Sequence, residues 1–262
     1  MNENIFVPDN PNDLELVISL TKKLSAERGL AYQELGMIDS CPIMLLTPKT
    51  TSDAKKILAA AGFHGNEYAG VWGLINYLQY GSKLENVSFL PLVSPIAFKE
   101  NRRYGKDNKI SNQGFCHPEM NLIPSEEGKI LISHAELLLS LGRDGFISLH
   151  EAPEKKMFYV YAFEKGDQSS SIPKELLRVG AKEFGYAADG TAMHYGGTAM
   201  QYGGTAKDGI IFNFHDSSFE DFMFENGVPH SIVTETPTSG NLEKRIKTIA
   251  EIIDTFIRLV QA

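Results

Sequence analysis

Apolar residues recur along the chain in two patterns, short uninterrupted runs and longer helical repeats. Residues 12–28 carry apolar side chains at spacings of three and four after Asn12 and Asp13, which predicts an amphipathic helix that ends at Gly29. Further helices are expected at residues 68–79, 126–141, 173–184 and 242–260. Runs that predict strands lie at residues 43–46, 57–61, 87–93, 146–149, 157–162 and 231–234. This alternation predicts an α/β sheet with helices on its faces.

Residues 1–262 are expected to form one domain. A chain of 262 residues can fold around one hydrophobic core, and we find no linker rich in Pro, Ser and Gly. The repeat at residues 192–198 and 199–205 has two copies of seven residues. Two copies are too few for a solenoid, so we expect a glycine-rich loop or hairpin there.

Composition and charge exclude several classes of function. The chain has 25 Lys and Arg residues against 33 Asp and Glu residues, which argues against nucleic acid as a partner. No apolar run approaches the roughly 20 residues of a membrane span, and the first residues lack the pattern of a signal peptide. We therefore expect no membrane association and a cytoplasmic location, with Cys41 and Cys116 as free thiols.

Candidate metal-ligating residues follow two of the predicted strands. His64 and Glu67 lie where an apolar run breaks into a turn before a helix, and His150 ends another run. In an α/β sheet, ligands bind beyond the carboxyl ends of strands. Two His and one Glu are the ligand set of catalytic zinc sites, with a fourth position left for water. The alternative for the first pair is an ordinary helix start, with Glu67 favourably placed in its first turn.

Glu235 ends a third apolar run and is the candidate general base. With it, four ordered blocks resemble the zinc carboxypeptidase superfamily, which includes the aspartoacylase and succinylglutamate desuccinylase branch. They are residues 64–67, 95–104, 149–151 and 234–237. The resemblance implies a mixed, largely eight-stranded sheet with helices on both faces and zinc at the strand ends. It also implies hydrolysis of an amide bond, with Glu235 as general base and acid.

The blocks that bind substrate in this superfamily differ here. Arg103 is favoured over Arg102 as the group that faces the developing oxyanion, because its spacing better matches the acylase branch. Asn121 is the nearest match to a substrate-binding asparagine, but Leu122 stands where the family has an arginine, and Asn66 stands where digestive carboxypeptidases have one. A substrate carboxylate must then be held by Arg102, Arg103 or another group.

Tyr195 and Tyr202 lie in the repeated Tyr-Gly-Gly turns, in the segment from which the peptidase branch supplies a loop tyrosine. One hypothesis is a lid over the substrate, and the alternative is a surface hairpin without contact to the site. The remaining histidines have no second ligand at a convincing spacing and are expected to be surface or loop residues. They are His117, His134, His194, His215 and His230.

Three functions remain open at this point. The favoured one is a zinc-dependent, metallocarboxypeptidase-like hydrolase that cleaves small peptides and holds one zinc ion per chain. The second keeps zinc and acts on N-acyl amino acids. The third is a non-catalytic zinc-binding module, against which Glu235 argues because binding alone needs no base. Nickel and cobalt also suit His and Glu ligands, and the sequence does not indicate an oligomeric state.

Overall fold

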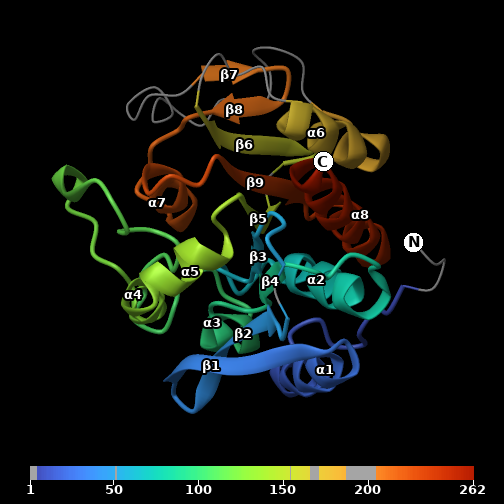
Figure 1. Cartoon of the computed structure of the whole chain (residues 1–262), viewed down its shortest axis with the longest axis vertical. Helices are drawn as coiled ribbons and strands as arrows, with labels where there is room; N and C mark the ends of the chain where they lie inside the picture. Colours follow the sequence, from blue (N-terminus) through green and yellow to red (C-terminus); the bar gives the residue numbers. More distant parts are fainter. Residues whose placement is uncertain (1–4, 51, 154, 166–170, 187–204) are drawn as a thin grey trace.

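A nine-stranded mixed sheet runs through the part of the chain that the computed structural model describes, residues 5–50, 52–153, 155–165, 171–186 and 205–262 (Figure 1). The strand order is β1-β2-β4-β3-β5-β9-β6-β8-β7. The strands are β1 (Leu30–Ile38), β2 (Cys41–Pro48), β3 (Ile57–Ala61), β4 (Val87–Leu90), β5 (Gly145–Ala152), β6 (Tyr159–Glu164), β7 (Thr205–Lys207), β8 (Ile210–Phe212) and β9 (His230–Pro237). The helices are α1 (Leu14–Glu27), α2 (Tyr68–Tyr80), α3 (Pro95–Lys99), α4 (Glu126–Ser133), α5 (Ala135–Leu141), α6 (Ser171–Phe184), α7 (Phe219–Glu225) and α8 (Leu242–Gln261), with a 3-10 turn at Pro118–Met120.

Four parallel strands form the middle of the sheet. β4 pairs with β3, β3 with β5, and β5 with β9, all in parallel. Their carboxyl ends therefore lie at one edge of the sheet, where ligands bind in folds of this kind. The predicted α/β sheet with helices on both faces is confirmed, and it has one strand more than the resemblance implies.

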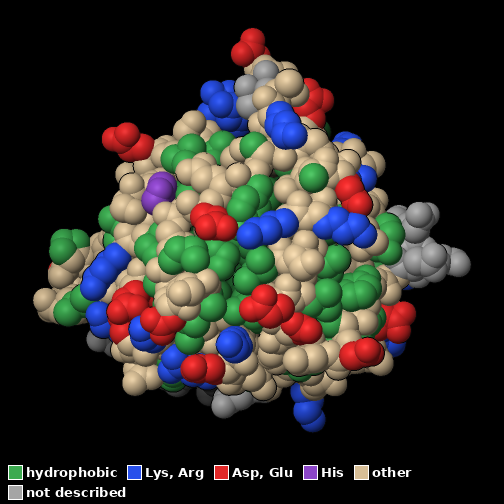
Figure 2. All heavy atoms as spheres, turned by 90° about the horizontal axis from the view of Figure 1, so that it is seen from below, with side chains coloured by type: hydrophobic (Ala, Val, Ile, Leu, Met, Phe, Trp, Pro, Cys, Tyr) green, Lys and Arg blue, Asp and Glu red, His purple; other side chains and the backbone are tan. Residues whose placement is uncertain are grey.

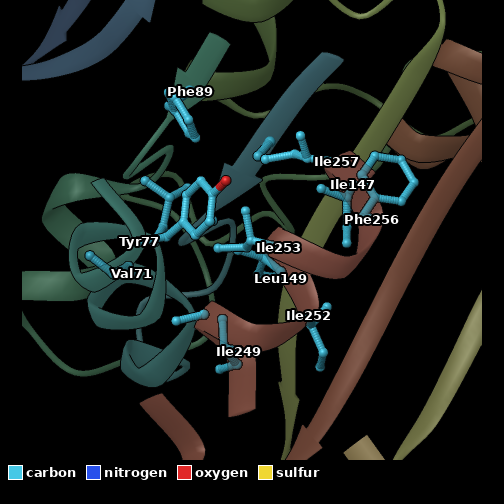
Figure 3. Packing of buried hydrophobic residues seen from close by; sticks show 14 of the residues in the cluster. Val71, Tyr77, Phe89, Ile147, Leu149, Ile249, Ile252, Ile253, Phe256 and Ile257 are labelled. Atoms are coloured by element: carbon cyan, nitrogen blue, oxygen red, sulfur yellow. The ribbon is translucent and has the colours of Figure 1, made fainter. Parts of the chain in front are cut away.

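Helices cover both faces of the sheet and define two cores (Figure 1). On one face α1, α2, α6 and α8 pack against the sheet, and on the other face α4, α5 and α7 do so. Figure 3 shows Ile249 and Ile253 of α8 on the side of α2, which carries Val71, and Phe256 of α8 near Ile147 of β5. These side chains are fully or almost fully buried, so this contact fixes the C-terminal helix on the sheet.

Two helix predictions have different outcomes. The first helix begins as expected, because the Asp13 carboxylate accepts a hydrogen bond from Leu16 N at 2.9 Å. The predicted helix at 126–141 is wrong as one element, since it is divided into α4 and α5 at His134. There Ser133 Oγ donates to Ile130 O at 2.7 Å, and His134 Nδ1 lies 3.0 Å from the same oxygen. Side chains thus compete for a carbonyl that a continuous helix would use.

Strand β1 was not predicted, because its sequence lacks a regular alternation. Its pairing with β2 shifts register between Glu34 and Gly36, and such a bulge interrupts the two-residue period of a strand. Strands β7 and β8 have only three residues each, which is too short for a recognisable pattern. The edges of the sheet were therefore harder to predict than its centre.

The surface in Figure 2 carries Lys and Arg side chains scattered among Asp and Glu side chains, rather than gathered in one patch. Among the described residues, no helix has both the length and the apolar character that a membrane crossing requires. Cys41 and Cys116 are free, as predicted.

Candidate metal centre

The segment that follows β3 carries His64 and Glu67 into the interior, where both are almost fully buried. Glu67 N donates to His64 O at 3.2 Å, which closes a tight turn immediately before α2. Gly65 lets this turn press against α3, because a Cβ at this position would lie 1.9 Å from the carbonyl carbon of Ala97. The absence of a side chain at Gly65 therefore allows the turn, and with it His64 and Glu67, to lie against α3.

His150 lies near the end of β5 and faces these two residues. Its Nδ1 atom is 2.9 Å from Glu67 Oε2, which also accepts a hydrogen bond from Glu151 N at 3.2 Å. One ligand atom from each of His64, Glu67 and His150 lies within 4.8 Å of the others. Phe63 stacks on the His150 ring at a centroid distance of 5.8 Å. Two nitrogens and one carboxylate oxygen thus lie close enough together to be shared by a single divalent ion.

Glu220 of α7 lies at the other nitrogen of the His150 ring. Its Oε1 atom is 3.3 Å from His150 Nε2, and its side chain is fully buried. Metal-binding histidines commonly place their second nitrogen against a carboxylate, which fixes the ring orientation and raises the basicity of the ligand. Sequence reasoning missed Glu220, because it belongs to no motif and lies 70 residues from His150.

Glu235 stands beside His150 through the pairing of the sheet. The two residues are register partners on the parallel strands β5 and β9, and such partners point to the same face. The pKa of Glu235 is raised to about 8, chiefly because burial removes water from the carboxyl. The neighbouring Glu67 charge also raises this pKa, whereas His150 and Arg103 lower it.

The ionisable groups of the centre change one another's pKa values, some upward and others downward. Burial raises the pKa of Glu67, but the charges of His64, His150 and Arg103 outweigh it and lower the value to about 2. Burial lowers the pKa of His64 to about 4. The pKa of His150 is raised well above its usual value, because Glu67 and Glu220 together outweigh the effect of burial. Carboxylates that gather around one imidazole make an environment that favours a cation.

Arg103 joins this group and Arg102 does not. The Arg103 guanidinium lies 2.8 Å from Glu67 Oε1 and is about half exposed. Arg102 instead forms an ion pair with Glu100 at 2.6 Å, and its guanidinium also donates to Asn108 Oδ1 at 3.3 Å. Of the two candidate arginines, the structure brings Arg103 to the candidate ligands.

The other candidate substrate-binding residues have different surroundings. Asn66 follows Gly65, and its Oδ1 atom is buried without a hydrogen-bond partner among the described residues. Asn121 is exposed, and its amide donates to Glu119 O at 3.3 Å in the turn that it ends. Tyr195 and Tyr202 lie outside the described residues.

Comparison with known proteins relates this fold to metallopeptidases. No protein-family model and no curated protein matched the sequence. A solved structure from Shewanella amazonensis SB2B, provisionally named a metallopeptidase, is 30% identical with a TM-score of 0.87, over 98% of this chain and 99% of that chain. The chain belongs to this metallopeptidase-like family.

Two further structures show the same fold. A family member from Shewanella denitrificans OS217, which carries the same provisional name, is 29% identical with a TM-score of 0.85, over 100% of this chain and 99% of that chain. A metallo-carboxypeptidase from Burkholderia cenocepacia is 15% identical with a TM-score of 0.61, over 94% of this chain and 68% of that chain. The metallopeptidase-like family therefore has the zinc carboxypeptidase-like fold that the four sequence blocks imply. The aspartoacylase branch is not represented among these structures.

Proposed function

We propose that this chain is a metal-dependent hydrolase that cleaves an amide bond in small peptides, with zinc held by His64, Glu67 and His150. The observation that carries the proposal is the buried convergence of these three ligand atoms within 4.8 Å at the strand ends. Three protein ligands of this kind leave a coordination position open, as in catalytic zinc sites. The names of the similar solved structures support the same class of reaction.

Glu235 is the proposed general base and acid. A zinc ion in this centre supplies a Lewis acid that lowers the pKa of a water molecule and polarises the scissile carbonyl. Glu235 takes up the proton of the attacking water and passes it to the leaving nitrogen. Burial raises the pKa of Glu235 while the centre holds no metal, and the positive charge of a bound zinc ion would lower it again, toward the ionised form that a general base needs.

Arg103 and Glu220 have supporting roles in this proposal. The half-exposed guanidinium of Arg103 lies against Glu67 and offers positive charge to the negative charge that develops on the substrate oxygen. A donor of this kind typically contributes about 3 kcal/mol to the transition state. Glu220 orients His150 through Nε2 and thereby positions a ligand without contacting substrate.

The substrate class is tested by the release of amine from a mixed panel. The panel contains peptides with a free C-terminus, the same peptides amidated at the C-terminus, and N-acyl amino acids. The zinc-loaded protein is compared with its Glu235→Gln variant as the blank. We expect hydrolysis of the peptides above the blank. Hydrolysis of N-acyl amino acids alone would overturn the peptide assignment, and a panel no faster than the blank would overturn hydrolysis itself.

A further inference from the structure

A second group of ligand-type side chains adjoins Glu220. One ligand atom from each of His117, His215, Asp221 and Glu225 lies within 4.8 Å of the others. His215 Nδ1 is 2.7 Å from Asp221 Oδ1 and 3.6 Å from Glu225 Oε1. His117 Nε2 is 2.9 Å from Asp221 Oδ2. Two imidazoles from distant parts of the chain thus share one carboxylate.

Three separate elements supply this group. Asp221 and Glu225 are four residues apart on α7 and so lie on one face of the helix. His215 comes from the loop before α7, and His117 comes from the long connection between α3 and α4. The two loops are joined by their backbones, since Gly114 N and Phe115 N both donate to Ser217 O, at 2.9 and 3.1 Å. The position of both histidines is therefore fixed by the fold rather than by chance contact at the surface.

Of the two histidines at Asp221, one is within hydrogen-bond distance of the carboxylate through His215 Nδ1, and the other leaves a buried ring nitrogen without a hydrogen bond. Asp221 is fully buried, and it already accepts a hydrogen bond from Ser217 N at 3.1 Å. His117 Nε2 is also buried, yet it makes no hydrogen bond despite its 2.9 Å distance from Asp221 Oδ2. A ring nitrogen and a carboxylate oxygen in this relation are both able to donate electron pairs to one ion. His215 and Glu225 are more exposed, which leaves a path for the ion to enter.

We propose that His117, His215 and Asp221, with Glu225 at the solvent side, form a second site for a divalent cation of the zinc class. Nitrogen and carboxylate ligands together suit zinc, nickel and cobalt. An ion here fastens two loops to α7. Because Glu220 precedes Asp221 and contacts His150, the same ion holds Glu220 against the first centre.

Cys116 lies beside this group but is not one of the proposed ligands. Among the described residues, the ligand atoms that lie within 4.8 Å of one another come from the two histidines, Asp221 and Glu225, and the Cys116 sulfur is not one of them. We therefore expect Cys116→Ser to bind as much metal as the unchanged protein.

The test is metal content after chelator treatment and dialysis against a small excess of zinc. We expect about two ions per chain in the unchanged protein, and about one in His215→Ala, in Asp221→Asn and in His64→Ala. His230→Ala is the matched control, because His230 pairs with Glu164 at 3.2 Å outside both groups and should leave the content at about two. Metal content is read without substrate, so this test is independent of the proposed hydrolysis.

A second measurement covers variants that fold poorly. In His64→Ala protein the first centre lacks a ligand, so a rise of the thermal midpoint on addition of zinc reports the second site. We expect this rise, and we expect it to disappear when His117→Gln is added. A content of about one zinc in the unchanged protein, or a folded His215→Ala protein that keeps about two, would overturn the proposal. So would a thermal midpoint of the His64→Ala protein that zinc leaves unchanged.

Discussion

His150 and Glu235 are register partners on the adjacent parallel strands β5 and β9. The proposed third metal ligand and the proposed base therefore stand side by side through sheet pairing, not through the conformation of a loop. His64 and Glu67 follow β3, which is the other parallel neighbour of β5. Three adjacent strand ends thus assemble the centre.

Replacing Arg103 and Arg102 separately tests the assignment of the oxyanion donor. Arg103→Gln should lower kcat/KM by about 100-fold, because its guanidinium lies at the metal ligands and a charged donor contributes about 3 kcal/mol. Arg102→Gln is the matched control and should change kcat/KM less than about threefold, since Arg102 pairs with Glu100. The measurement is steady-state kinetics on one peptide substrate. Equal losses of kcat/KM in the two variants would contradict the assignment of Arg103, rather than Arg102, as the oxyanion donor.

Glu220→Gln should weaken metal binding at the first centre without removing a ligand. The variant keeps the shape of the side chain but loses the charge against His150 Nε2, and partners of this kind typically contribute about 10- to 100-fold to metal affinity. Competition with a chromogenic chelator measures the affinity. Glu243→Gln, an exposed change in the first turn of α8, serves as the control. Equal affinity in Glu220→Gln and in the unchanged protein would contradict the positioning role.

Gly65→Ala should destabilise the fold more than a glycine replacement at an open position. The added Cβ would meet the backbone of Ala97, and overpacking of this kind costs about 3 kcal/mol. Gly29→Ala is the comparison, because Gly29 has a φ of +68° but nothing within 4 Å, so about 1 kcal/mol is expected. Urea unfolding of both variants gives the two free energies. Equal losses of unfolding free energy in the two variants would show that the close approach of residue 65 to Ala97 adds no energetic cost.

The raised pKa of Glu235 predicts how stability depends on pH after the metal is removed by a chelator. The folded chain raises this pKa from 4.5 to about 8, so the folded state binds the proton more tightly than the unfolded state. Proton binding by Glu235 therefore contributes fully to the free energy of unfolding below pH 4.5, and this contribution is lost as the pH rises through 8.

Glu235→Gln should therefore have a free energy of unfolding higher than that of the unchanged protein at pH 9, by at most about 5 kcal/mol, with the difference fading toward pH 4.5. Urea unfolding at pH 5, 7 and 9 measures this difference, and Glu243→Gln controls for loss of a carboxylate elsewhere. A constant difference across these pH values would show that burial of Glu235 does not control its ionisation.

Much of the centre of the fold could be predicted from the sequence, because the patterns that indicate it lie within single segments of the chain. Uninterrupted apolar runs indicate the buried strands β3 and β5, and a histidine or carboxylate at a strand end marks the edge where ligands bind. Glu220 could not be found this way, because its contact with His150 depends on how α7 packs across 70 residues of sequence. No pattern within a single segment contains that information.

The histidines outside the motif illustrate the same limit. His117 and His215 lie in loops, as expected, and both meet the buried carboxylate of Asp221, a contact that their spacing along the sequence does not indicate. Their proximity arises from backbone pairing between two loops, which spacing along the chain does not reveal. The division of the predicted helix at His134 likewise depends on side chains that bind a carbonyl, not on a helix-breaking residue.

The most direct test of the account compares metal content and hydrolysis in Glu235→Gln and His150→Ala. Glu235→Gln should keep its metal and lose at least about 100-fold in kcat, because only the proton carrier is removed. His150→Ala should lose both metal and hydrolysis, because a ligand is removed. A Glu235→Gln protein that binds no metal, or one that retains full turnover, would contradict the roles assigned to these two side chains.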